Sequence, residues 1–172
     1  MSRPCFAAPL LLSFGTCISS HALADFVDDS KATVELRNFY LNRDFRQANA
    51  PQSKTAEWAQ GFTGRFNSGF TEGTLGFGVD ALAQMGLKLD SSPDRHGSGL
   101  LPFGDRGRAA DNYSKLGLTA KARFAESQLK VGTLLPKMPY LQYSNSRLLP
   151  QTFEGWQLQS KDIDQLTATF GE

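Results

Sequence analysis

Cysteine is almost absent from this sequence, and none occurs after residue 24. The two cysteines, Cys5 and Cys17, both lie in an N-terminal segment that has the pattern of a cleavable signal peptide. The rest of the chain can therefore form no disulfide bond and no cysteine-based metal site. Small exported domains commonly depend on disulfides, so this absence favours a fold held together in another way, such as a barrel joined by backbone hydrogen bonds.

The N-terminal segment lacks the length of a membrane-spanning helix. Its apolar run from Phe6 to Ile18 is shorter than the about 20 residues that such a helix needs. A positive charge at Arg3 precedes this run, and Ala22-Leu23-Ala24 provides small residues at a cleavage position. We therefore predict that residues 1–24 are a signal peptide and that residues 25–172 are exported; the alternative is a buried apolar helix.

The chain after residue 24 has no excess of charge of either sign. Without Arg3 the 18 lysines and arginines become 17, which balances the 17 aspartates and glutamates. Net charge thus gives no indication of a nucleic-acid partner. Histidine is equally scarce, because His96 is the only one after His21. With no glycine-rich phosphate loop and no cluster of metal ligands at the usual spacing, the sequence indicates no enzyme, no cofactor and no metal site.

Long apolar runs are also missing after residue 24, so any membrane crossing there has to use strands in a closed barrel. What is present is a recurring alternation of apolar and polar residues, which is the period of a β-strand. The longest alternating segment, Glu72 to Asp90, greatly exceeds the roughly 5–6 residues usual for strands of soluble sheets. Six further segments alternate in the same way: Lys31 to Arg43, Glu57 to Phe70, Tyr113 to Phe124, Ser127 to Leu135, Phe153 to Ser160 and Gln165 to Phe170.

The connections between these segments are alternately long and short. The long ones are Arg43 to Ala56, Asp90 to Asn112 and Pro136 to Thr152; the short ones are Asn67 to Glu72, Ala125 to Ser127 and Lys161 to Asp164. Up-and-down membrane barrels have short periplasmic turns and long extracellular loops. The pattern therefore predicts an all-β, antiparallel, up-and-down transmembrane β-barrel.

Aromatic residues near the segment ends favour the same fold. Membrane barrels carry aromatic girdles at both interfaces, and the candidates here are Trp58, Phe70, Tyr113, Phe124 and Phe170. Alternation alone also fits a half-buried soluble sheet. A soluble periplasmic β-domain that binds a ligand or a partner therefore remains as an alternative. A surface hydrolase built on a barrel is a third hypothesis, but the sequence has no catalytic constellation for it.

The polar face of the alternating segments carries many cations. They include Arg37, Arg43, Arg65, Lys88, Lys115, Lys121, Arg123 and Lys130. A water-filled lumen lined by cations favours anions, and a guanidinium can hold a carboxylate through two hydrogen bonds. Alternatively, these side chains only solvate the wall and pair with acids such as Glu35 and Asp80.

Several short stretches resemble the OprD family of substrate-specific outer-membrane porins. The resemblance covers essentially all of the chain from Asp25 to Glu172. It lies in the stretches 26–30, 36–40, 57–62, 68–74, 78–81, 113–117, 130–134 and 147–153. Membership of this family implies a mostly monomeric, 18-stranded barrel in the outer membrane, through which small carboxylates and basic amino acids are taken up without a covalent step.

The resemblance also implies two features of the pore. The third extracellular loop, here Pro136 to Thr152, is expected to fold into the lumen, where it would present Lys137, Tyr143 and Arg147 to small anionic or zwitterionic solutes. A ladder of arginines along the wall is expected to include Arg43 or Arg46, together with Arg147. Alternation alone adds Arg37, Arg65, Lys121 and Arg123 as candidates. For Arg147 an ion pair that only holds the loop is an open alternative.

The number of alternating segments departs from the family. Seven segments are well short of 18 strands, and an open sheet has unpaired edges that lipid does not tolerate. We expect the chain to be a truncated N-terminal part of the barrel, with about seven of its strands, that does not conduct by itself.

Overall fold

The structure is a computed structural model that describes residues 26–138, 140–164 and 166–172, apart from the side chain of Arg106. The predicted signal peptide lies outside the described residues. Residues 26–28 form a short helical segment before the first strand. No helix among the described residues is long and apolar enough to cross a membrane.

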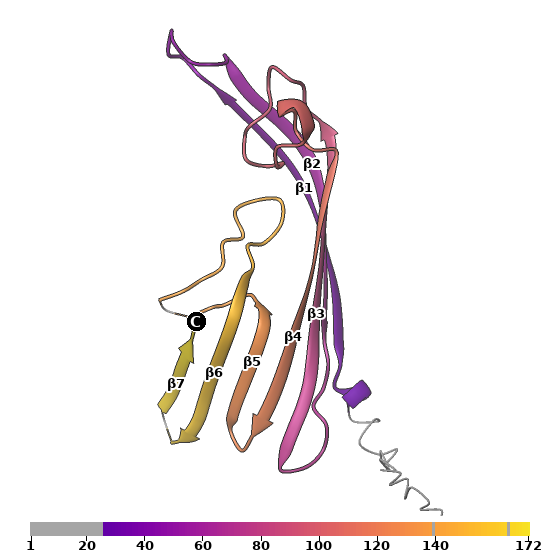
Figure 1. Ribbon diagram of the computed structural model, residues 1–172, viewed down its shortest axis with the longest axis vertical. Helices are drawn as coiled ribbons and strands as arrows, with labels where there is room; N and C mark the ends of the chain where they lie inside the picture. Colours follow the sequence, from indigo (N-terminus) through magenta and orange to yellow (C-terminus); the bar gives the residue numbers. More distant parts are fainter. Residues whose placement is uncertain (1–25, 139, 165) are drawn as a thin grey trace, which may run out of the picture.

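Seven antiparallel strands form one sheet in the order of the sequence (Figure 1). The strands are β1 (Lys31–Asp44), β2 (Lys54–Asn67), β3 (Leu75–Asp90), β4 (Asn112–Phe124), β5 (Ser127–Leu134), β6 (Phe153–Ile163) and β7 (Leu166–Gly171). Each strand pairs only with its neighbours in the sequence, so the topology is up-and-down throughout the described residues. This confirms the predicted fold class.

The two faces of the sheet differ in polarity, because successive side chains of a strand point to opposite sides. One face, here called the outer face, carries large apolar side chains that no other part of the described chain covers. Val34 is 76% exposed and Leu116 is 71% exposed, and Phe77 and Trp58 are exposed beside them. A soluble sheet buries such a face under a second layer, whereas a membrane barrel turns it toward lipid.

The opposite, inner face is polar and carries the loops. Figure 1 shows β1 to β4 extending far beyond β5 to β7 at the end that holds the long loops. At that end the loops 91–111 and 135–152 contribute Leu100, Leu101, Ala109 and Leu148 to a small buried core on Ala59 of β2. Phe39 and Tyr113 pack against this core from β1 and β4, together with Leu149 of the second loop.

This core explains the single break in the alternation of β1. Phe39 faces inward and contributes to the core, whereas Asn38 faces outward. Asn38 is not left unsatisfied on the apolar side, because its Oδ1 accepts a hydrogen bond from Trp58 Nε1 (2.8 Å) and its Nδ2 donates to Gln60 Oε1 (3.1 Å). Mutual hydrogen bonding lowers the cost of placing such polar groups next to lipid.

Two of the predicted girdle residues lie on the wrong side. Tyr113 faces inward, where it packs on the loop core and donates from its hydroxyl to the Leu100 carbonyl (3.4 Å). Phe70 does not belong to β2, which begins at Lys54 and ends at Asn67 instead of running from Glu57 to Phe70. The turn 68–74 folds over the inner face, and the Phe70 ring lies there against Arg123. Phe124 and Phe170 are exposed on the outer face.

Candidate pore-lining site

Loop 135–152 leaves the sheet at β5, and its return toward β6 crosses the inner faces of four other strands. Lys115 of β4 donates from Nζ to Thr152 Oγ1 (2.6 Å), and Gln84 of β3 donates from Nε2 to the Pro150 carbonyl (2.9 Å). Further along, Leu148 lies against Gly61 of β2. The loop therefore rests on the sheet over much of its length.

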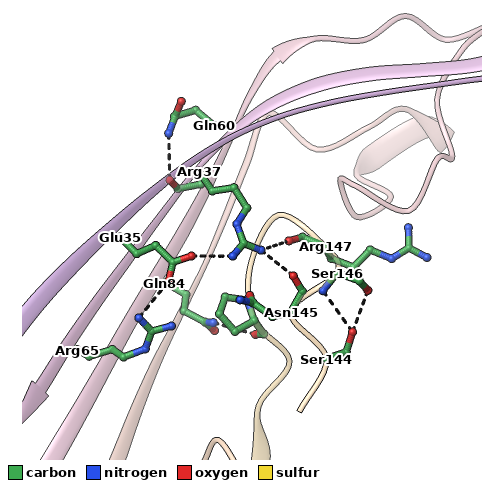
Figure 2. Close-up of polar contacts among 11 residues, drawn as sticks. Glu35, Arg37, Gln60, Arg65, Gln84, Ser144, Asn145, Ser146 and Arg147 are labelled. Atoms are coloured by element: carbon green, nitrogen blue, oxygen red, sulfur yellow. Dashed lines mark hydrogen bonds and ion pairs between the residues drawn. The ribbon is translucent and has the colours of Figure 1, made fainter. Parts of the chain in front are cut away.

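Arg37 of β1 contacts the far end of the crossing. Its Nη1 donates to two main-chain carbonyl oxygens of the loop, at Asn145 (2.9 Å) and at Arg147 (2.7 Å). Figure 2 shows the guanidinium lying between these carbonyls on one side and Glu35 on the other. A charged donor shared between two carbonyls is a strong anchor, because hydrogen bonds to charged groups exceed neutral ones in strength.

Glu35 fixes the orientation of this guanidinium. One carboxylate oxygen accepts from Arg37 Nη2 (2.7 Å), and the other accepts from Arg65 Nη1 of β2 (3.1 Å). The three side chains lie on adjacent inner-face positions, since Glu35 pairs with Thr63 and Arg37 pairs with Gly61 in the ladder. Two cations therefore share one carboxylate here, which leaves a net positive charge beside the loop.

Arg147 forms a hydrogen bond to a main-chain carbonyl instead of the loop ion pair that was the alternative for it. Its Nη1 donates to the Ser98 carbonyl of loop 91–111 (3.1 Å), and no acidic partner is recorded for it among the described residues. The backbone of Arg147 is held by Arg37, while its side chain points away from Arg37 (Figure 2). The residue thus joins the two loops and still exposes part of its guanidinium.

Loop 91–111 is in turn fixed to the sheet by a fully buried carboxylate. Glu57 of β2 accepts hydrogen bonds from the Ser98 hydroxyl and from the Gly97 amide (3.2 Å). At the base of the loop, Asp111 forms an ion pair with Lys88 of β3. The hydrogen bond from Lys88 and its charge hold the pKa of Asp111 below the usual range of an aspartate.

The structure brings only some of the predicted site residues together. Arg37 binds the loop at the Arg147 carbonyl, and Arg65 is joined to Arg37 through Glu35. Lys137 and Tyr143 belong to the loop, with the Lys137 ammonium 5.7 Å from the centre of the Tyr143 ring. The other predicted residues lie elsewhere.

Arg43 and Arg46 are exposed at the loop end of β1, and within the described part of the chain neither forms a recorded hydrogen bond or ion pair. Lys121 is buried and forms an ion pair with Asp80. It thus follows the alternative in which cations of the polar face pair with nearby acids. Arg123 stacks on Phe70 near the short turns.

Sequence reasoning missed the residues that hold the loop through small size or neutral hydrogen bonds. Gly61 and Gln84 both lie on the polar face by alternation, which is the only signal that the sequence gives for them. Their partners, Leu148 and Pro150, are more than 60 residues away. No local pattern could have paired them.

Comparisons with known proteins show which family the chain is similar to. Residues 24–172 match the family described as outer membrane porin, OprD family. The porin-like protein GalP of Pseudomonas putida is 42% identical over 167 residues, which cover 95% of this chain and 40% of the relative. Porin D of Pseudomonas aeruginosa is 42% identical over 146 residues, covering 85% of this chain and 32% of the relative.

Solved structures agree with this placement. OccK9 (OpdG) of Pseudomonas aeruginosa superposes with a TM-score of 0.82 at 54% identity and covers 85% of this chain and 38% of that one. OpdK of the same organism, solved with vanillate, superposes with a TM-score of 0.74 at 46% identity. This match covers 85% of the present chain and 36% of OpdK.

The chain thus spans about 40% of the length of the first relative it matches. Proteins of this family are channels of the outer membrane and not enzymes, which disfavours the soluble-domain and hydrolase alternatives. The sheet order, the uncovered apolar face and these matches together show that the chain belongs to the OprD family of outer-membrane porins.

Proposed function

We propose that the barrel containing this chain allows small carboxylates or amino acids to diffuse passively and selectively into the periplasm. The observation that carries the proposal is the loop 135–152, which Arg37 holds against the inner face beside Arg65 and Arg147. Among the described residues, Arg37 and Arg65 share the carboxylate of Glu35, while the Arg147 guanidinium, directed toward loop 91–111, has no ion-pair partner. A passing carboxylate would find hydrogen-bond donors there at little cost of reorganisation.

Charge placement supports an anionic or zwitterionic solute. Arg147 has N–H groups beyond the one that it donates to Ser98, and it is exposed. Arg43 and Arg46 are exposed at the end of the sheet that carries the long loops, which would be the extracellular end, and there they would attract anions toward loop 135–152. The relative OpdK was solved with vanillate, which is a carboxylate, and this adds support from a protein 46% identical to the chain.

The described sheet supplies one side of the proposed pore. Edge strands β1 and β7 each have one unpaired side among the described residues, and lipid does not tolerate such edges. We therefore propose that conduction requires further strands, as in the 18-stranded monomers of the family. The uncovered apolar face would then contact outer-membrane lipid.

Flux into liposomes tests this proposal. Liposomes that contain the closed barrel should take up radiolabelled benzoate much faster than a quaternary ammonium ion of similar size. Arg147→Gln should slow benzoate entry about tenfold, because a charge-assisted contact is lost. Arg108→Gln, which removes an exposed cation from loop 91–111, is the matched control and should leave the rate unchanged. Equal entry of benzoate and the ammonium ion into wild-type liposomes would contradict the proposal.

A further inference from the structure

The turn 68–74, between β2 and β3, folds over the inner face at the end of the sheet that carries the short turns. Two glycines of β3 make room for it. A Cβ at Gly76 would lie 3.0 Å from the Thr71 carbonyl oxygen and 3.2 Å from Phe70 Cβ. A Cβ at Gly78 would lie 2.6 Å from the Gly69 carbonyl oxygen. The turn therefore sits directly on the wall, because neither glycine carries a side chain of its own that would hold it away.

Lys121 of β4 fixes this turn in place. Its Nζ donates to the Ser68 carbonyl (2.6 Å) and pairs with Asp80 Oδ1 (2.6 Å), while its side chain is only 6% exposed. The Ser68 hydroxyl in turn accepts from the Val79 amide (2.8 Å). Because its partners are already in place, Lys121 positions the turn and has little capacity to bind a solute.

The Phe70 ring lies within cation–π distance of two cations. The Lys121 ammonium is 4.8 Å from the ring centre, and the Arg123 guanidinium is 4.7 Å from it. Unlike Lys121, Arg123 is exposed, and among the described residues it has neither a recorded hydrogen bond nor an ion pair. The aromatic ring thus holds a guanidinium whose hydrogen-bond donors are still available.

Amide side chains continue from Arg123 across the inner face. In the ladder Arg123 pairs with Gln128 of β5, and Gln128 pairs with Gln159 of β6. A hollow of about 360 Å³ opens over this row, and Phe70 also lines it. The row therefore presents one guanidinium and two amides to the same space.

The charged groups at the hollow are two cations, Arg123 and Lys161, and two carboxylates, Glu126 and the neighbouring Asp162. Lys161 and Glu126 also line it, and their charges are opposite. Asp162 lies nearby, but its carboxylate accepts hydrogen bonds from Ser127, from Ser160 and from the Glu126 amide. Asp162 keeps its charge, but its oxygens are already occupied, and among the described residues neither carboxylate forms an ion pair with Arg123, so the hydrogen-bond donors of Arg123 stay available.

We propose that this hollow is an exit subsite, at the periplasmic mouth of the pore, that binds carboxylates leaving the lumen. Arg123 would hold the carboxylate, Gln128 and Gln159 would donate from their amides, and Phe70 is a positioning residue that keeps the guanidinium in place. The subsite rests on the proposed porin function, and it lies on the walls of β4 to β6, away from loop 135–152. Short turns mark the periplasmic end of such barrels.

Single-channel block in a planar bilayer tests the subsite, with benzoate added on the side of the short turns. Arg123→Gln should weaken the apparent affinity for benzoate about tenfold, because a charge-assisted contact is lost. Phe70→Leu should weaken it about threefold, and Phe70→Tyr should retain it, because tyrosine keeps the aromatic face. In the Arg123→Gln background, Phe70→Leu should have no further effect.

Lys31→Gln is the matched control, since it removes a cation from the start of β1 at the same end of the sheet. It should leave the affinity unchanged. Unchanged affinity in Arg123→Gln would overturn the subsite, and so would equal weakening in Lys31→Gln, which would show a general effect of charge at the mouth. Absence of any channel in the wild-type protein would instead contradict the proposed porin function.

Discussion

Leu148 packs directly against Gly61, and the contact has no room for a side chain on the strand. A Cβ at residue 61 would lie 2.9 Å from the Leu148 carbonyl oxygen and 3.1 Å from its Cγ. Leu148 is also one of the most buried of the described residues, at 1% exposure. The position of loop 135–152 thus depends on the absence of one side chain from β2.

Gly61→Val should therefore displace the loop from the wall. Because the lumen would widen, single-channel conductance should rise and discrimination between anions and cations should fall. Gly64→Ala is the matched control on the same strand, since its Cβ would find its nearest neighbour at 3.9 Å, an ordinary contact. Similar conductance in Gly61→Val and in the wild type would contradict this role of Gly61.

Arg37→Met should loosen the same loop from its other side. The change removes both hydrogen bonds to the carbonyls of Asn145 and Arg147 and leaves Glu35 paired with Arg65 alone. Because hydrogen bonds to charged groups contribute about 1.5–3 kcal/mol when well shielded, and this site is partly exposed, we expect about tenfold faster amide exchange in residues 144–148. Hydrogen exchange measured by mass spectrometry would show it.

Lys130→Met serves as the control for that experiment, because Lys130 has no recorded contact with the loop among the described residues. Exchange in residues 144–148 should be as slow in this variant as in the wild type. If Arg37→Met also left it slow, the contacts of Gly61, Gln84 and Lys115 would suffice to hold the loop.

Glu57→Leu should release loop 91–111. The buried Ser98 hydroxyl and the Gly97 amide would lose their acceptor, and an unsatisfied buried polar group costs about 1–3 kcal/mol. The midpoint of urea unfolding, followed by tryptophan fluorescence, should fall accordingly. Glu57→Gln keeps an acceptor oxygen and should lose less. A larger loss in Glu57→Gln than in Glu57→Leu would show that hydrogen bonding is not the reason for the buried residue.

The ion pair at the base of loop 91–111 has a predictable pH dependence. The pKa of Asp111 is lowered by Lys88 in the folded protein, so the pair stabilises the fold above the unfolded-state pKa of Asp111. This contribution is lost as the pH falls through the lowered folded-state pKa. Lys88→Met should raise the pKa of Asp111 toward its ordinary value in a carboxyl NMR titration. An unchanged pKa would exclude Lys88 as the cause.

The fold could be predicted from the sequence because the alternation of apolar and polar residues is a local signal. Seven strands, their order and the apolar outer face follow from residues that are close together in the chain, such as Val34 and Leu36 or Phe77 and Val79. The alternation fails where long-range contacts decide. Phe70 has the same spacing as Phe66, yet Lys121 and the bare wall at Gly76 and Gly78 turn it inward.

The candidate site was accessible to sequence reasoning only in part. Arg37 and Arg65 were identified because alternation places them on the polar face, and Glu35 was named there as a partner. The contacts that make this a site join β1 to residues more than 100 positions away, at Asn145 and Arg147. Lys121 has the same spacing signal as Arg123, yet it is buried and bonded to Ser68 and Asp80, whereas Arg123 is exposed.

The most direct test of the proposed anion-selective pore is the reversal potential of the closed barrel in a potassium chloride gradient. Arg37, Arg65 and Arg147 around loop 135–152 predict a preference for chloride over potassium in the wild type, and the preference should decrease when Arg147 is replaced by glutamine. A wild-type channel that prefers potassium would contradict the proposal that these arginines make the pore selective for anions.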